Sequence, residues 1–112
     1  MTITETEGNE MKKLVRNKIP QFATDADYRK LDLEEIEPAL KDKIVEEALE
    51  VQAATTEKNL IEELGDVYTV LTSFLKFKKI DQKTFLAAVE AKRKEKGDFS
   101  DFLLMETEDN DD

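Results

Sequence analysis

Two residue types that build many active sites are absent from this chain of 112 residues, which has no cysteine and no histidine. Without cysteine there are no disulfides, no thiolate metal sites and no cysteine nucleophiles. Without histidine, zinc sites built on imidazole, the serine, histidine and aspartate triad and the Glu-x-x-His pattern of di-iron bundles are also excluded. Metal chemistry in this chain therefore has to use oxygen ligands.

Long apolar runs are lacking as well, and none reaches the roughly 18 residues that a membrane-spanning helix requires. The first ten residues are acidic and polar, whereas a signal peptide begins with basic residues and continues with an apolar stretch. We therefore expect a cytoplasmic protein without a membrane partner. A single domain of this size buries only about 60 to 70% of its unfolded surface, so we expect self-association to supply additional core.

The net charge of −10 is concentrated at the two ends of the chain. Residues 1–10 carry three acids and no base, residues 106–112 carry five acids and no base, and the body between them is nearly balanced. Because such short acidic ends cannot bury apolar area, both are predicted to be disordered tails. No basic face is evident, so no nucleic-acid partner is expected.

Residues 11–105 are predicted to form one all-α domain. Residues 11–30 lack a sustained period and predict an extended arm with short strand or turn pieces. A first helix begins near Asp32, a good N-cap, or else near Pro38, which suits a first turn, and it runs to about Ala54. A second helix begins between Thr56 and Asn59 and runs to about Lys78, with apolar residues at steps of three and four.

The third helix has the clearest boundaries, with Asp81 as N-cap and Gly97 as the closing residue. The connection between the first two helices is short, and a short connection makes helices antiparallel neighbours. The predicted fold is therefore an antiparallel helical hairpin plus a third helix, which completes a core of the four-helix-bundle type when copies associate.

Two acidic clusters lie on the two helices of this hairpin, and each contains two acids three residues apart on one helix face. They contribute Glu46, Glu47 and Glu50 from the first helix and Glu62, Glu63 and Asp66 from the second. Antiparallel pairing brings the clusters to comparable heights. Carboxylates gathered in a partly apolar setting repel one another unless a cation neutralises them, and an all-oxygen set suits Mg²⁺ or Mn²⁺. From the spacing alone, ordinary surface glutamates remain the alternative.

Position around each helix, at about 100° per residue, separates these acids from one another. Glu47 falls inside the apolar arc of the first helix, and Glu63 falls between apolar positions of the second. Glu50 and Asp66 lie at the adjoining edges. Glu46 and Glu62 point further round, so we expect them either to be more exposed or to act as outer partners of the direct ligands.

Three segments resemble the all-alpha nucleotide pyrophosphatases of the MazG superfamily, specifically the phosphoribosyl-ATP pyrophosphohydrolase-like branch. The metal motif of that family, E-E-x-x-E followed by E-x-x-D, is matched by Glu46, Glu47 and Glu50 and then by Glu63 and Asp66. Residues 13–20, KLVRNKIP, are similar to the K-L-V-R-D-K-I-P opening of the branch, and residues 92–99 resemble its basic segment closed by glycine. The resemblance spans roughly residues 12 to 104.

The resemblance implies a Mg²⁺-dependent enzyme that cleaves the bond between the α and β phosphates of a nucleoside triphosphate and releases a monophosphate and pyrophosphate. By the same resemblance, Glu47, Glu50, Glu63 and Asp66 hold the metal, and Glu46 is a candidate outer ligand or base. Cations suited to phosphate oxygens are Arg16, Lys18, Lys92, Arg93 and Lys96.

Two positions depart from the pattern of the branch. Asn17 stands where the branch often has aspartate, and Asp98 stands where it often has a second glycine. Phosphoribosyl-ATP as the substrate is one alternative, and a non-catalytic helical oligomer or regulatory binding module is another. Self-association as a homodimer or homotetramer is expected from the size, from the resemblance, and from Val45 and Leu49, which lie outside the main apolar arc of the first helix.

Overall fold

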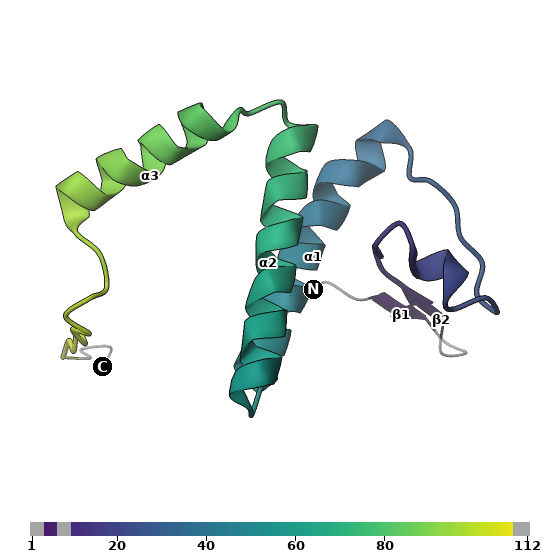
Figure 1. Cartoon of the computed structure of the whole chain (residues 1–112), viewed down its shortest axis with the longest axis horizontal. Helices are drawn as coiled ribbons and strands as arrows, with labels where there is room; N and C mark the ends of the chain where they lie inside the picture. The colour runs from purple at the N-terminus through teal and green to yellow at the C-terminus, as the bar shows by residue number, and fades with distance from the viewer. Residues whose placement is uncertain (1–3, 7–9, 109–112) are drawn as a thin grey trace. The chain divides into compact units, whose positions relative to one another are not determined.

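The computed structural model describes residues 4–6 and 10–108 and has two compact units, Met1–Lys79 and Ile80–Asp112. The first unit contains the strands β1 (Thr4–Thr6) and β2 (Glu10–Lys12), a 3-10 turn (Ile19–Gln21) and the helices α1 (Leu33–Ala53) and α2 (Glu57–Phe77). The second contains α3 (Gln82–Lys96). Figure 1 labels these elements. The all-α fold class is confirmed, because the only sheet in the described residues is this antiparallel pair of three-residue strands.

The disorder of the two acidic tails stays a prediction, and some of their residues lie in the described range. Residues 4–6 form β1 and Glu10 begins β2, so this part of the predicted disordered segment 1–10 has regular backbone pairing, Thr4 with Lys12 and Thr6 with Glu10. Cross-strand hydrogen bonds can order a polar segment that buries little apolar area. Residues 106–108 have no regular secondary structure, and residues 1–3, 7–9 and 109–112 lie outside the described range.

α1 begins at Asp32, the first of the two predicted starts. The backbone N–H of Asp32 donates to Glu35 Oε1 at 2.7 Å, and Arg29 Nη2 holds the other oxygen of that carboxylate at 2.9 Å. These contacts fix the first turn in the manner of a capping box. Pro38 consequently lies inside the helix and not in its first turn, so its ring nitrogen gives the carbonyl of Glu34 no hydrogen bond.

The other helix ends also follow the sequence signals. Thr56 Oγ1 accepts a hydrogen bond from the N–H of Asn59 at 3.1 Å at the start of α2, and Asp81 Oδ1 accepts one from the N–H of Thr84 at 2.7 Å at the start of α3. Gly97 closes α3 with φ at 88°, a left-handed value that glycine adopts without a Cβ penalty. Within the described residues, no helix has the length and apolar composition required to cross a membrane.

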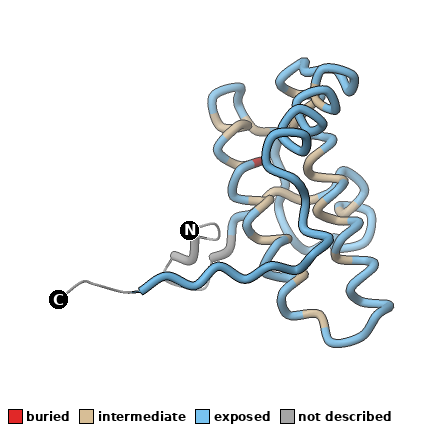
Figure 2. The backbone as a smooth tube through the Cα atoms, turned by 90° about the vertical axis from the view of Figure 1, so that its left-hand side faces the viewer, coloured by how far each residue is buried: buried red, intermediate tan, exposed pale blue. Residues whose placement is uncertain are grey.

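α1 and α2 pack side by side as an antiparallel hairpin, and Lys78 Nζ donates to Glu37 Oε1 at 2.8 Å between the end of α2 and the beginning of α1. The core of this hairpin is small. Leu40, 6% exposed, is the one residue of the buried class in the range 12–108, and Figure 2 shows how few residues are buried. Ile36, Ile44 and Val51 of the predicted apolar arc of α1 are half-buried, whereas Ala48 is exposed.

Candidate metal centre

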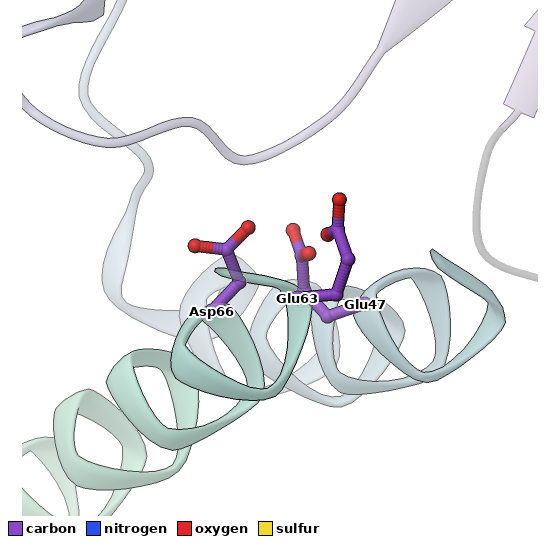
Figure 3. Close-up of side chains that lie close together, drawn as sticks. All are labelled: Glu47, Glu63 and Asp66. Carbon is purple, nitrogen blue, oxygen red and sulfur yellow. The ribbon is translucent and has the colours of Figure 1, made fainter. Parts of the chain in front are cut away.

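Three carboxylates converge where the acidic clusters of α1 and α2 meet. Oxygen atoms of Glu47, Glu63 and Asp66 all lie within 4.8 Å of one another, and Figure 3 shows the three side chains on the same side of the helix pair. The side chain of Glu47 is 12% exposed, and Glu63 and Asp66 are half-buried. The antiparallel hairpin therefore places acids from two helices in one partly desolvated position, as the spacing predicts.

Glu63 is the least compensated member of this trio. Burial raises its pKa above the usual glutamate value, and the negative charges of Asp66, Glu50 and Glu47 raise it further. Among the residues that the structure describes, Glu63 forms no ion pair. Its carboxylate is therefore the one for which an added cation brings the largest relief.

The other two members already have cationic neighbours. Lys43 Nζ lies 3.3 Å from Glu47 Oε2 and 3.1 Å from Glu46 Oε1, and its side chain is only 13% exposed. Arg16, from the N-terminal arm, donates from Nη2 to Asp66 Oδ1 at 2.6 Å. The three acids therefore lie among cations and do not form a bare cluster of acids.

The remaining acids of the two clusters differ from one another. Glu50 is exposed and lies outside the trio, although its charge helps to raise the pKa of Glu63. Glu46, expected either to be more exposed or to lie outside the direct ligands, has a side chain that is 13% exposed, and Lys43 and Lys13 contact its two oxygens, Lys13 Nζ at 3.6 Å. Its role as an outer ligand or base stays a prediction. Glu62 is exposed, as predicted.

A cavity of about 260 Å³ adjoins the carboxylates within the first unit. Its wall includes Glu47, Asp66, Arg16 and Lys43, and Lys13 also lines it. The rest of the lining is mostly apolar and comes from the arm and both helices, with two hydroxyl groups: Leu14, Val15, Ile19, Leu40, Val70, Thr69 and Ser73. A space that pairs charged groups with an apolar wall has the usual character of a small-molecule site.

The five predicted phosphate-binding cations fall into two sets. Arg16 lines the cavity, while Lys18 in the same unit is exposed and is not part of its wall. Lys92, Arg93 and Lys96 are exposed on α3, in the second unit, where Arg93 Nε lies 3.5 Å from Glu90 Oε1. Phosphate contact by these three residues stays a prediction.

Asn17 and Asp98, the two positions that depart from the pattern of the branch, are both exposed. The Asp98 carboxylate accepts hydrogen bonds from the N–H and the hydroxyl of Ser100 at 3.0 and 2.7 Å.

Sequence reasoning missed Lys43, the most buried cation at the site. A signal was available, because lysine three residues before Glu46 and four before Glu47 lies on their helix face. Such spacing is common on solvent faces, so the spacing alone does not distinguish this lysine from a surface residue.

The fold and the site together define an all-α protein with a candidate metal centre of carboxylates on a helical hairpin. The family model described as phosphoribosyl-ATP pyrophosphohydrolase matches residues 9–93 of this chain, which include both acidic clusters. The chain therefore belongs to the phosphoribosyl-ATP pyrophosphohydrolase family, and this membership indicates a pyrophosphohydrolase activity. Comparisons with curated proteins and with solved structures gave no match.

Proposed function

We propose that this chain is a Mg²⁺-dependent nucleotide pyrophosphohydrolase of the house-cleaning type, which hydrolyses the α–β phosphoanhydride of a nucleoside triphosphate. The products are a nucleoside monophosphate and pyrophosphate. The observation that carries the proposal is the convergence of Glu47, Glu63 and Asp66 within 4.8 Å beside a cavity in a chain of this family. Family membership supports the reaction class, and the choice of substrate is our inference.

The residues present fit a hard divalent cation. The donors are all carboxylate oxygens, they converge from two helices, and the raised pKa of Glu63 shows that the position favours added positive charge. Glu47, Glu63 and Asp66 would hold the ion, and the family resemblance adds Glu50, which is exposed outside this trio. Mn²⁺ is the natural substitute. When bound, such an ion offsets phosphate charge and lowers the pKa of a bound water near neutral pH, which a site without histidine requires.

The chain's own groups then account for substrate binding. Arg16 and Lys43 on the cavity wall suit phosphate oxygens, the guanidinium as a fork and the ammonium as a point charge. The apolar wall, including Leu14 and Val70, suits the less polar part of a nucleotide and excludes water from the phosphates. Glu46 is the candidate outer ligand or base, and Lys43 and Lys13 lie beside its two oxygens at 3.1 and 3.6 Å.

Phosphoribosyl-ATP is a second candidate substrate, favoured by the family model itself. It contains the same type of phosphoanhydride, so the metal centre serves either substrate in the same way. The difference has to come from groups that contact the base and the additional ribose. Including phosphoribosyl-ATP in the substrate panel separates the two possibilities directly.

We also propose that the active form is a homodimer or homotetramer. Large apolar side chains on the hairpin remain exposed, among them Ile61 at 62%, Leu49 at 55% and Tyr68 at 62%, while Leu40 alone is buried in the range 12–108. Exposed apolar area of this extent on a small chain indicates an association surface. Packing two hairpins against each other would produce the four-helix core predicted from the sequence.

The decisive experiment is product analysis with canonical, deoxy and damaged nucleoside triphosphates and phosphoribosyl-ATP in the presence of Mg²⁺. Glu47→Gln and Glu63→Gln are expected to abolish the release of pyrophosphate and monophosphate, and Glu62→Gln, an exposed acid of the same cluster, serves as the matched control. No product from any substrate, with folded protein and bound metal, would favour the non-catalytic binding module instead.

A further inference from the structure

Two of the three converging carboxylates are already paired with cations that come from different parts of the chain. Lys43 contacts Glu47 from one turn earlier on α1, and Arg16 reaches Asp66 on α2 from the N-terminal arm. Lys43 contacts one oxygen of Glu47, Oε2, and Arg16 contacts one oxygen of Asp66, Oδ1. A divalent ion at these carboxylates therefore competes with the ammonium and the guanidinium for the same negative charges.

Lys43 is difficult to explain as a purely structural residue. A lysine with a side chain only 13% exposed loses solvation and rotamer freedom, and lysine is rarely so buried without a partner. Its partners Glu46 and Glu47 lie on its own helix, at spacings of three and four residues, so these ion pairs join no two elements of the fold. Pairs of this kind contribute little to helix stability. A role at the site accounts better for its position.

The cavity shows where the displaced cations would be useful. Lys43 and Arg16 both line it, next to the carboxylates that they contact. If Glu47 and Asp66 turn to a metal ion, the guanidinium loses its acidic partner and the ammonium keeps only Glu46, so both cations remain at the cavity wall with less of their charge compensated. Such groups bind phosphate oxygens well.

We propose that Lys43 and Arg16 are exchangeable counter-ions: they occupy Glu47 and Asp66 in the metal-free protein, a divalent ion displaces them, and they then bind the phosphate chain. The inference rests on the proposed function, because it requires metal at this centre. It assigns Lys43 to the substrate-binding machinery, and it makes metal binding and phosphate binding mutually reinforcing. By linkage, each ligand then raises the affinity for the other.

The first test measures Mn²⁺ binding without nucleotide by isothermal titration calorimetry on the full chain. Lys43→Met is expected to bind Mn²⁺ more tightly than the wild type, by roughly fivefold or more, because no ammonium competes for Glu47. Lys41→Met is the matched control, since Lys41 is also on α1 and pairs with an acid four residues away, Glu37, at 3.4 Å, but outside the cavity. Its Mn²⁺ affinity should match that of the wild type.

Removing any positive charge near the carboxylates raises their affinity for a metal ion, whether or not that charge is displaced in the wild type. A second measurement therefore follows the displacement of Arg16 and Lys43 directly. In NMR spectra of wild-type protein without nucleotide, titration with Mg²⁺ should shift the side-chain N–H signals of Arg16 and Lys43 while leaving those of Lys41 in place. Pyrophosphate added at saturating Mg²⁺ should then bind Lys43→Met more weakly than wild type. Arg16→Gln removes the cation beside Asp66, so it too should bind Mn²⁺ more tightly without nucleotide and bind pyrophosphate more weakly at saturating Mg²⁺. This variant replaces Lys43→Met if the latter does not fold.

The outcomes separate this inference from the proposed function. If wild-type protein binds Mn²⁺ but Lys43→Met binds it no more tightly, or if the Arg16 and Lys43 signals stay fixed while backbone signals of Glu47 and Asp66 report bound metal, counter-ion exchange is wrong and the metal centre stands. If wild-type protein binds no metal at all, both proposals fail.

Discussion

Glu63 on α2 presents a carboxylate oxygen within 4.8 Å of one on Glu47 of α1, and only Glu47 has an ammonium beside it. Glu47 and Glu63, two glutamates of the same carboxylate trio, therefore have different charged neighbours. Lys43 compensates Glu47, whereas burial and the surrounding acids raise the pKa of Glu63. Of these two carboxylates, Glu63 is the one whose negative charge is not compensated. A substitution at Glu63 is therefore the most direct test of the electrostatics of this site.

Glu63→Gln should stabilise the metal-free protein near neutral pH. A carboxyl group whose folded-state pKa is raised favours folding when protonated, so its unfavourable effect appears as the pH rises through the unfolded value of about 4.3 toward the higher folded value. The melting temperature of the variant should exceed that of wild type at pH 7, and the two should converge at pH 4 and below. Mg²⁺ should raise the melting temperature of wild type only. Equal melting temperatures at pH 7 would show that Glu63 is not under electrostatic stress.

Glu50 and Glu47 should differ in their effect on turnover, although the family motif treats both as ligands. Glu47 belongs to the converging trio, and Glu50 is exposed outside it. We expect Glu50→Gln to lower kcat/KM by about 10- to 100-fold, as removal of an outer partner of a metal site does, and Glu47→Gln to remove measurable turnover. Steady-state kinetics at saturating Mg²⁺ measures both; equal losses would place Glu50 among the direct ligands.

The ion pair at the start of α1 should make stability depend on acid pH. The hydrogen bond from Arg29, helped by the N–H of Asp32, lowers the pKa of Glu35 from 4.5 to about 2. Its stabilising contribution is complete above pH 4.5 and is lost as the pH falls toward 2. Glu35→Gln should therefore lower the urea midpoint at pH 7 and leave it unchanged at pH 2. Glu34→Gln, an exposed neighbour, is the control and should change neither midpoint.

The helices and the convergence of the acids were predictable because local rules determine them. Asp32, Thr56, Asp81 and Gly97 each supply a capping signal within one turn of the helix end, and the short connection makes the hairpin antiparallel. Glu63 and Asp66 share a face by spacing alone. These features require no knowledge of how distant segments meet.

The contacts of the N-terminal arm were not predictable in the same way. Arg16 and Asp66 are 50 residues apart in the chain, and residues 11–30 have no periodicity that gives their direction. Lys13 from the same arm contacts Glu46 at 3.6 Å, and a helical projection does not include such a contact. Contacts between an irregular segment and a helix are tertiary, and local patterns do not encode them.

The exposed apolar face of the hairpin should determine the oligomeric state. Ile61 and Glu62 are adjacent on α2 and both exposed, yet they point about 100° apart around the helix, with Ile61 on the side of Leu64 and Tyr68. Lysine at position 61 would bury a charge in the proposed interface, whereas lysine at position 62 would remain in solvent. Ile61→Lys should therefore shift the mass measured by light scattering at micromolar concentration toward the monomer, and Glu62→Lys should keep the dimer or tetramer of the wild type. A monomeric wild type would refute the proposed association, and an unchanged mass in Ile61→Lys would move the interface to another face.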